Sequence, residues 1–119
     1  MNIGRKTTGG KYHRNRKKRW FENQSQENKT TLGQTKNKII RTMGGHKKAI
    51  LLKSNEVNLV TGKKTEKTEI KNVLQTPQNV FLARQNRLIK GAIIETSKGQ
   101  AKITNRPSRE GIVNAILIE

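Results

Sequence analysis

Apolar residues are unevenly distributed along this chain. Residues 1–48 contain nine side chains of the apolar types (AVILMFWYC), whereas residues 49–119 contain 27. Only the C-terminal part therefore has enough apolar surface to offset the loss of chain entropy on folding. A length of 119 residues agrees, because it corresponds to one small domain with at most one tail. The sequence predicts a C-terminal core preceded by a segment that does not fold by itself.

Charge is the second constraint. Lysine and arginine number 26 against eight acids, all glutamate, so the net charge is +18 and the isoelectric point is about 11.0. Residues 1–48 carry +12 and residues 49–119 carry +6. Such an excess needs an anionic partner, and nucleic acid is the first candidate. No apolar run reaches the length of a membrane span or of a signal peptide, so we expect a soluble protein with no membrane partner.

The first 19 residues hold eight cations and no acid. Like charges at this density repel one another in water, so we expect this segment to be disordered in the free protein. We divide the chain into a basic extension, residues 1–34, and a folded domain, residues 35–119. The extension is expected to become ordered only on its anionic partner.

Short β-branched runs separated by turn residues begin near residue 36, a pattern typical of a small sheet or barrel. Candidate strands are residues 37–43, 47–53, 56–60, 65–74, 91–96, 100–105 and 112–118, and residues 106–111 are expected to form a turn. The runs at 49–52 and 112–118 are almost continuously apolar, which predicts strands that are central or covered on both sides. Thr76 before Pro77 predicts one short helix over residues 76–84, capped by the threonine. The predicted fold class is all-β, a barrel of about six strands with one short helix and a basic N-terminal extension.

The chain offers little to catalysis or metal binding. It has no aspartate and no cysteine, and its two histidines, His13 and His46, stand among cations. A general base would lack an orienting acid, and a metal would lack a complete ligand set. The glycines at 4 and 9 have the spacing of a phosphate loop, but Gly10 stands where that motif needs lysine. We therefore expect no enzymatic activity, no cofactor, no metal and no small-molecule substrate.

The basic head, which we define as residues 5–21, is the most informative stretch. Three of the four aromatic residues lie within it, and five cations between positions 14 and 19 precede Trp20 and Phe21 directly. Cations bind a phosphate backbone through counterion release, and aromatic faces stack on unpaired bases, a combination typical of RNA binding. We expect these five cations to be unpaired by acid. The alternative for Trp20 and Phe21 is a hydrophobic plug that docks the head onto the barrel. The candidate RNA-binding residues of the head are Arg5, Lys6, Gly9, Gly10, Lys11, Tyr12, His13, Arg14, Arg16, Lys17, Lys18, Arg19 and Trp20.

Two further basic segments lie between predicted strands. In the first, a glycine pair lets the backbone approach phosphate while both flanks supply donors. The second is a polar segment around Pro107. For each, the alternative is a hairpin turn with solvated charges. Their candidate residues are Arg41, Gly44, Gly45, His46, Lys47 and Lys48 in the first segment, and Arg106 and Arg109 in the second.

Seven short segments of the chain form a recognisable set: residues 8–11 (TGGK), 17–22 (KKRWFE), 31–33 (TLG), 41–45 (RTMGG), 90–96 (KGAIIET), 101–107 (AKITNRP) and 111–119 (GIVNAILIE). With these segments the chain resembles the S-eight-e family of archaeal and eukaryotic small-subunit ribosomal proteins, in its short archaeal form. The resemblance extends from about Arg5 to the C-terminus, with Gln34, Met43, His46 and Ser108 as departures from the family pattern.

This resemblance implies a small β-barrel with a basic extension lying on small-subunit ribosomal RNA, and no enzymatic activity. The expected protein is thus a structural constituent of the small ribosomal subunit, with ribosomal RNA and neighbouring ribosomal proteins as partners, located on ribosomes in the cytoplasm. Residues 1–34 would be its RNA-binding extension. The alternative is a chromatin-type protein that binds DNA without sequence preference, because charge alone does not separate the two nucleic acids.

Overall fold

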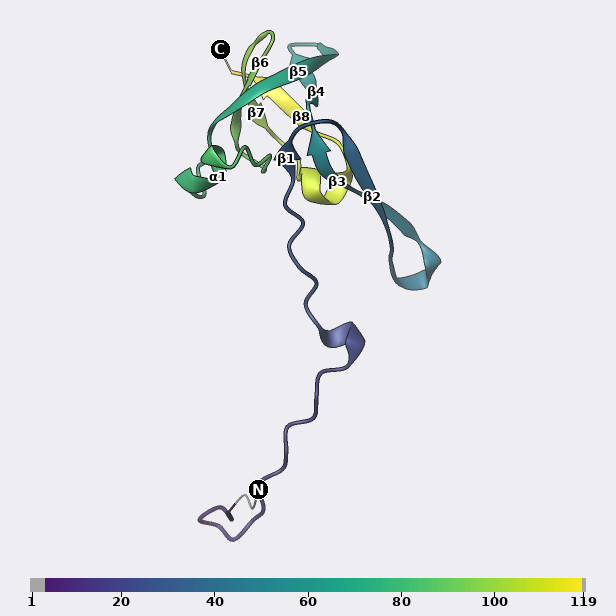
Figure 1. The fold of residues 1–119 in the computed structure, drawn as a ribbon, viewed down its shortest axis with the longest axis vertical. Helices are drawn as coiled ribbons and strands as arrows, with labels where there is room; N and C mark the ends of the chain where they lie inside the picture. Colours follow the sequence, from purple (N-terminus) through teal and green to yellow (C-terminus); the bar gives the residue numbers. More distant parts are fainter. Residues whose placement is uncertain (1–3, 119) are drawn as a thin grey trace.

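The computed structural model describes residues 4–118, and its strands form two sheets. Residues 1–3 and Glu119, the outer ends of the two predicted domains, lie outside the described residues. The folded part lies at one end of the molecule, and the N-terminal segment runs away from it as an extended chain (Figure 1). This segment gives the molecule a long axis of 71 Å against 35 and 25 Å for the other two.

Five strands close into a barrel, in the order β4 (Glu56–Thr61), β5 (Lys64–Gln75), β6 (Ile93–Thr96), β7 (Gly99–Ile103) and β8 (Asn114–Leu117). Successive strands pair antiparallel. The closing pair, β4 with β8, is parallel and aligns Leu59 with Ala115. Closure leaves no barrel strand with an unpaired edge. The predicted all-β small-barrel class is confirmed.

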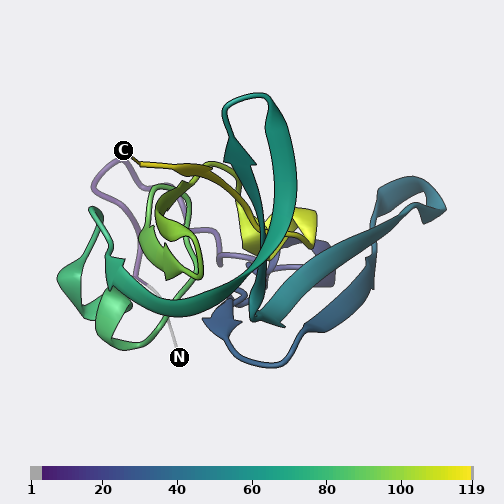
Figure 2. The same cartoon turned by 90° about the horizontal axis from the view of Figure 1, so that it is seen from above.

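Three more strands form a second sheet in the order β1-β3-β2: β1 (Thr31–Leu32), β2 (Lys36–Arg41) and β3 (Lys47–Ser54). Strand β1 runs parallel to β3, and β2 pairs antiparallel with it. The β2–β3 hairpin projects sideways from the barrel and ends in a 3₁₀ turn, η2 (Met43–Gly45) (Figure 2). The first two predicted strands therefore lie outside the closed barrel.

The predicted strands agree with the observed ones to within a few residues. Each of the seven overlaps one of the strands β2 to β8. The two-residue strand β1 was not predicted, because it forms by pairing with residues distant in the chain, those of β3 and Arg87. Strands β3 and β8 are central, as expected, but β8 is covered on one face only: Ile116 is 51% exposed on its outer face.

The helices differ from the prediction in two details. Helix α1 (Val80–Arg84) begins after its proline, because the side chain of Asn79 caps it by accepting the Phe81 amide at 3.0 Å, whereas the Thr76 hydroxyl donates to the Asn79 carbonyl. The expected cap at Thr76 is therefore wrong. A second helix, α2 (Pro107–Glu110), occupies the predicted turn. In the described part of the chain, no helix is long and apolar enough to cross a bilayer.

The core fills the barrel and extends to Leu51 of β3 and to Leu88, which lies between α1 and β6. Its small residues are alanines at 92, 101 and 115, which leave room for the larger side chains in a narrow interior. The core residues are Leu51, Val57, Leu59, Ile70, Val73, Leu88, Ala92, Ile94, Ala101, Ile103, Val113 and Ala115. Most come from alternate positions along the strands, as a sheet buried on one face requires.

Replacing Leu59 by alanine tests this packing. Leu59 is fully buried and pairs with β8 at the barrel closure, so Leu59→Ala should lower the free energy of unfolding by about 2 to 5 kcal/mol through lost burial and a cavity. Val60→Ala, the next residue and only half-buried, should cost less than about 1 kcal/mol. Urea unfolding of both variants measures the difference. If the two variants lost the same free energy of unfolding, Leu59 would not be the one of the two that faces the core.

Candidate nucleic-acid interface

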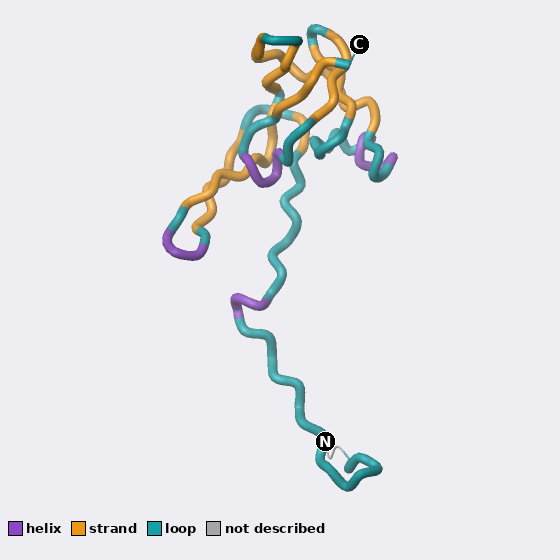
Figure 3. Tube along the Cα trace, turned by 180° about the vertical axis from the view of Figure 1, so that it is seen from behind, coloured by secondary structure: helices purple, strands orange, loops and turns teal. Residues whose placement is uncertain are grey.

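The N-terminal segment leaves the folded body next to β1 and extends away from the barrel (Figure 3). Its tip folds back on itself in a short hairpin. The Lys6 amide donates to the Gly10 carbonyl and the Gly9 amide donates to the Lys6 carbonyl, both at 2.9 Å. Gly9 has a φ of +80°, a left-handed conformation that favours glycine, and a Cβ there would meet nothing within 4 Å. The backbone at Gly9 is thus open to close approach.

A single 3₁₀ turn, η1 (Trp20–Glu22), interrupts the extended segment. Glu22 makes a two-pronged ion pair with Arg16, with N–O distances of 2.6 and 2.9 Å, and also accepts the Arg19 amide at 3.0 Å. The expectation that all five cations are unpaired is therefore wrong for Arg16, because the chain turns at η1 and brings an acid six residues later back to it. The other four, Arg14, Lys17, Lys18 and Arg19, form no ion pair with any described side chain.

The aromatic residues of the head are exposed. Trp20 is 90% exposed and Phe21 is 69% exposed, and neither belongs to the barrel core or packs against it within the described structure. The plug arrangement is therefore not the one that this structure adopts. Tyr12 is half-exposed, and the Lys6 ammonium lies 5.7 Å from its ring centre. The rings of Trp20 and Phe21 are therefore open to solvent.

The tip of the β2–β3 hairpin carries the second group of candidate residues. Gly44 and Gly45 both have a φ of +78°, and the Thr42 amide closes the tip by donating to the His46 carbonyl at 2.7 Å. The hairpin and the N-terminal segment extend from the same end of the barrel, but their tips lie apart (Figure 1). The candidate residues of this tip are all exposed: Arg41, Gly44, Gly45, His46, Lys47 and Lys48.

The third group lies on α2, which packs against β3. Gly111 ends this helix with a φ of +77°, and a Cβ there would lie 3.3 Å from the Ala49 Cβ, so glycine permits the close packing. Arg109 lines a cavity of about 410 Å³ together with Lys48, which joins the second and third candidate groups. Arg106 lines a neighbouring cavity of about 270 Å³.

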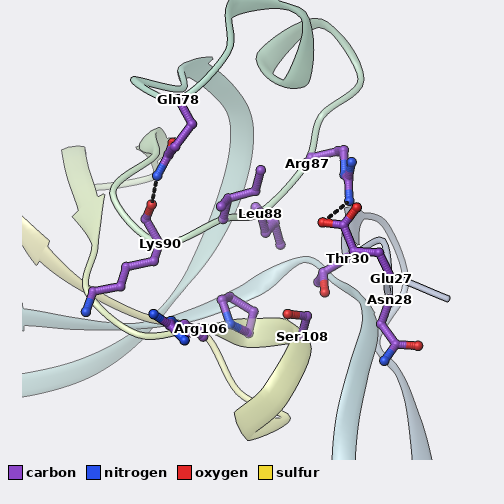
Figure 4. A pocket seen from close by; sticks show the side chains of 11 residues that line it. Glu27, Asn28, Thr30, Gln78, Arg87, Leu88, Lys90, Arg106 and Ser108 are labelled. Carbon is purple, nitrogen blue, oxygen red and sulfur yellow. Dashed lines mark hydrogen bonds and ion pairs between the residues drawn. The ribbon is translucent and has the colours of Figure 1, made fainter. Parts of the chain in front are cut away.

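Sequence reasoning missed two basic residues that line this smaller cavity. Arg87 stands beside Glu27 on the side opposite Arg106, whereas Lys90 lies on the same side as Arg106 (Figure 4). Arg87 and Lys90 belong to the segment between α1 and β6 and lie almost twenty residues from α2, and no motif marks them. Glu27 and Asn28, from the base of the N-terminal segment, line both cavities. Folding thus places cations from several segments where the basic extension meets the barrel.

Comparison with known proteins agrees with the resemblance found in the sequence. The family model described as Ribosomal protein S8e matches residues 2–118. The chain is 46% identical to the small ribosomal subunit protein eS8 of Methanococcus aeolicus, over 96% of this chain and 91% of that protein. It is 42% identical to the protein of that name from Methanosarcina barkeri and 38% identical to that of Haloarcula marismortui, in each case over 97% of this chain and 94% of the relative.

The η1 turn gives a prediction about pH. The Arg16 guanidinium, and after it the Arg19 amide, hold the pKa of the Glu22 carboxyl below that of an ordinary glutamate. The pair therefore stabilises the turn above the ordinary glutamate pKa, and this contribution is lost as the pH falls through the lowered value. Carbon-13 NMR titration of Glu22 should show Arg16→Gln raising the pKa and Arg14→Gln leaving it nearly unchanged. Equal effects of the two would indicate general charge and no specific pair.

Proposed function

The chain belongs to the ribosomal protein S8e family, and we propose that it is a structural protein of the small ribosomal subunit that binds the ribosomal RNA of that subunit. Its relatives carry the name of small ribosomal subunit proteins. The observation that carries the proposal is the basic head, which stands clear of the barrel with its cations and aromatic rings exposed. The protein acts by binding and not by catalysis, on ribosomes in the cytoplasm.

The basic head is the main RNA-binding element in this proposal. A cation-rich segment without a core of its own passes between RNA helices and neutralises phosphates, which releases counterions. Gly9 and Gly10 let the backbone approach RNA closely, while Trp20 and Tyr12 stack on bases or wedge into a groove. The full set is the one named from the sequence, residues 5, 6, 9–14 and 16–20.

The barrel presents the remaining contacts. The hairpin tip at residues 41–48 and the two arginines of the α2 segment bind further phosphates from positions that the fold fixes. We take residues 1–34 as the RNA-binding extension, whose basic head is disordered in the free protein, and residues 35–119 as the barrel domain. Strand β1 lies near this boundary and is the point where the extension joins the sheet. Other ribosomal proteins are its expected neighbours.

Removing three cations from the head tests RNA binding. Lys17, Lys18 and Arg19 changed together to alanine should weaken binding to small-subunit ribosomal RNA and flatten the slope of log affinity against log salt by about 2, or 0.7 to 0.9 per lost phosphate contact. Alanines at Lys63, Lys64 and Lys67, three exposed cations of the β4–β5 hairpin, provide the control with the same loss of charge. Filter binding over a range of salt measures both slopes.

Two outcomes would contradict this proposal. If both triple variants flatten the slope equally, binding is a property of total charge and not of the head. If the unmodified protein binds duplex DNA as tightly as ribosomal RNA at matched salt, the DNA-binding alternative is favoured.

Trp20 reports on the head directly, because it is the only tryptophan. In the free protein its emission should be that of an exposed indole with low anisotropy, since the head is flexible and the ring is 90% exposed. Ribosomal RNA should quench this emission and raise the anisotropy, and Trp20→Ala should weaken binding by about 1 to 3 kcal/mol without changing the melting temperature. A blue-shifted emission that RNA leaves unchanged would contradict both flexibility and stacking.

A further inference from the structure

Arg87 is a buried cation without a well-matched anion. The residue is 7% exposed, and its Nε is buried with no hydrogen-bond partner among the described residues. Among the described residues its one ion pair is with Glu27, at 3.5 Å from Nη2 to Oε1, longer than the roughly 2.7 to 2.9 Å of a strong charged hydrogen bond. A guanidinium does not lose its proton at any ordinary pH, so burial leaves it charged and poorly satisfied.

The backbone holds Arg87 firmly in this position. Its amide donates to the Leu82 carbonyl at 3.1 Å, and the residue forms an antiparallel bridge with Thr31. The next amide, that of Leu88, donates to the Thr30 carbonyl at 3.0 Å. The Thr30 side chain is buried and donates in turn to the Leu51 carbonyl at 2.9 Å. The backbone of Arg87 is thus fixed where α1, β1 and β3 meet, which places the side chain in a buried position.

The cavity beside Arg87 has the composition of an anion site. Lys90 and Arg106 line it together with Arg87, and Glu27 is its one acid among the described residues (Figure 4). The Gln78 amide reaches across and donates to the Lys90 carbonyl at 2.7 Å, which holds that wall in place. The volume of about 270 Å³ is enough for a phosphate group with adjoining sugar atoms.

Glu27 occupies the mouth of this cavity loosely. Its side chain is 77% exposed, so its carboxylate is still largely hydrated while it faces Arg87. Leaving Arg87 therefore costs this carboxylate little hydration, and it is the buried guanidinium that needs a replacement anion. The guanidinium, in contrast, would gain much from an anion that reaches into the cavity and accepts two parallel N–H bonds.

We propose that this cavity binds one backbone phosphate of RNA, which displaces the Glu27 carboxylate and makes a two-pronged contact with Arg87, while Lys90 and Arg106 on the opposite side make the cavity lining more positive. This inference rests on the proposed RNA-binding function. Glu27 acts as an internal stand-in for the phosphate while the protein is free. Because Glu27 lies at the base of the N-terminal segment, its release frees that segment from the barrel as the RNA enters.

The test compares conservative variants in binding to small-subunit ribosomal RNA. Arg87→Lys keeps the charge but loses the planar fork, and should lower the affinity about tenfold, the effect of one charged hydrogen bond. Arg84→Lys, an exposed arginine of α1, is the matched control and should change it less than about twofold. Glu27→Gln removes the competitor and should raise the affinity about three- to fivefold, whereas Glu69→Gln, an exposed acid of β5, should raise it less than about twofold.

A second readout reports on Arg87 itself. The Nε–H signal of Arg87, assigned by its absence from the Arg87→Lys spectrum, should shift when the unmodified protein binds ribosomal RNA. A signal that moves with inorganic phosphate but not with RNA would overturn the proposal in favour of a free phosphate site. A signal that moves with neither would overturn it outright.

The remaining outcomes are equally decisive. If Arg87→Lys lowers the melting temperature but leaves the RNA affinity of the folded protein unchanged, Arg87 has only a structural role and the proposal is wrong. If Glu27→Gln behaves like Glu69→Gln, the carboxylate does not compete with RNA and the exchange is refuted. Failure of the proposed function would appear in the unmodified protein as no preference for ribosomal RNA over duplex DNA, whereas failure of this site alone appears only in the variants.

Discussion

The parallel pairing of β4 with β8 is the contact on which the folded part depends. The barrel closes only when β8 pairs with β4, a strand that lies more than fifty residues earlier in the chain. Loop-closure entropy opposes such a distant pairing, and the core behind it must offset that cost. Leu59 lies fully buried in the closing strand, and small residues such as Ala101 and Ala115 let the narrow interior pack around it.

A closed barrel also suits a chain that is rich in cations and poor in large apolar side chains. With 26 lysines and arginines in 119 residues, this chain has few large apolar side chains to bury, and a five-stranded barrel needs few. Most cations then lie on the barrel's outside, on the β2–β3 hairpin or on the N-terminal segment, where they remain hydrated. The fold thus keeps the cations apart from the core while holding part of them in fixed positions around it.

Two glutamates near the N-terminus act as internal counter-ions, and they differ in how well they do so. Glu22 makes a tight two-pronged pair with exposed Arg16 and shapes the η1 turn through the Arg19 amide. Glu27 makes a single long contact with buried Arg87. Under the proposed function the first pair orients the basic head ahead of its aromatic residues, and the second holds the base of the segment on the barrel until a stronger anion replaces the carboxylate.

The sequence by itself determined the elements and the general chemistry of this protein. Alternating β-branched runs and their turn residues are local signals, so seven strands were predictable to within a few residues, and the cluster of unbalanced cations at residues 14–19 already indicated a polyanion partner. Tertiary structure decided what depends on residues distant in the chain: the parallel closure of the barrel, strand β1, the exposure of Trp20 away from the barrel, and the cavity around Arg87. The cavity shows the reason most clearly. Arg87 is an ordinary arginine in the sequence, and it becomes a buried cation only because the backbones of Leu82 and Thr31 hold it where three elements meet.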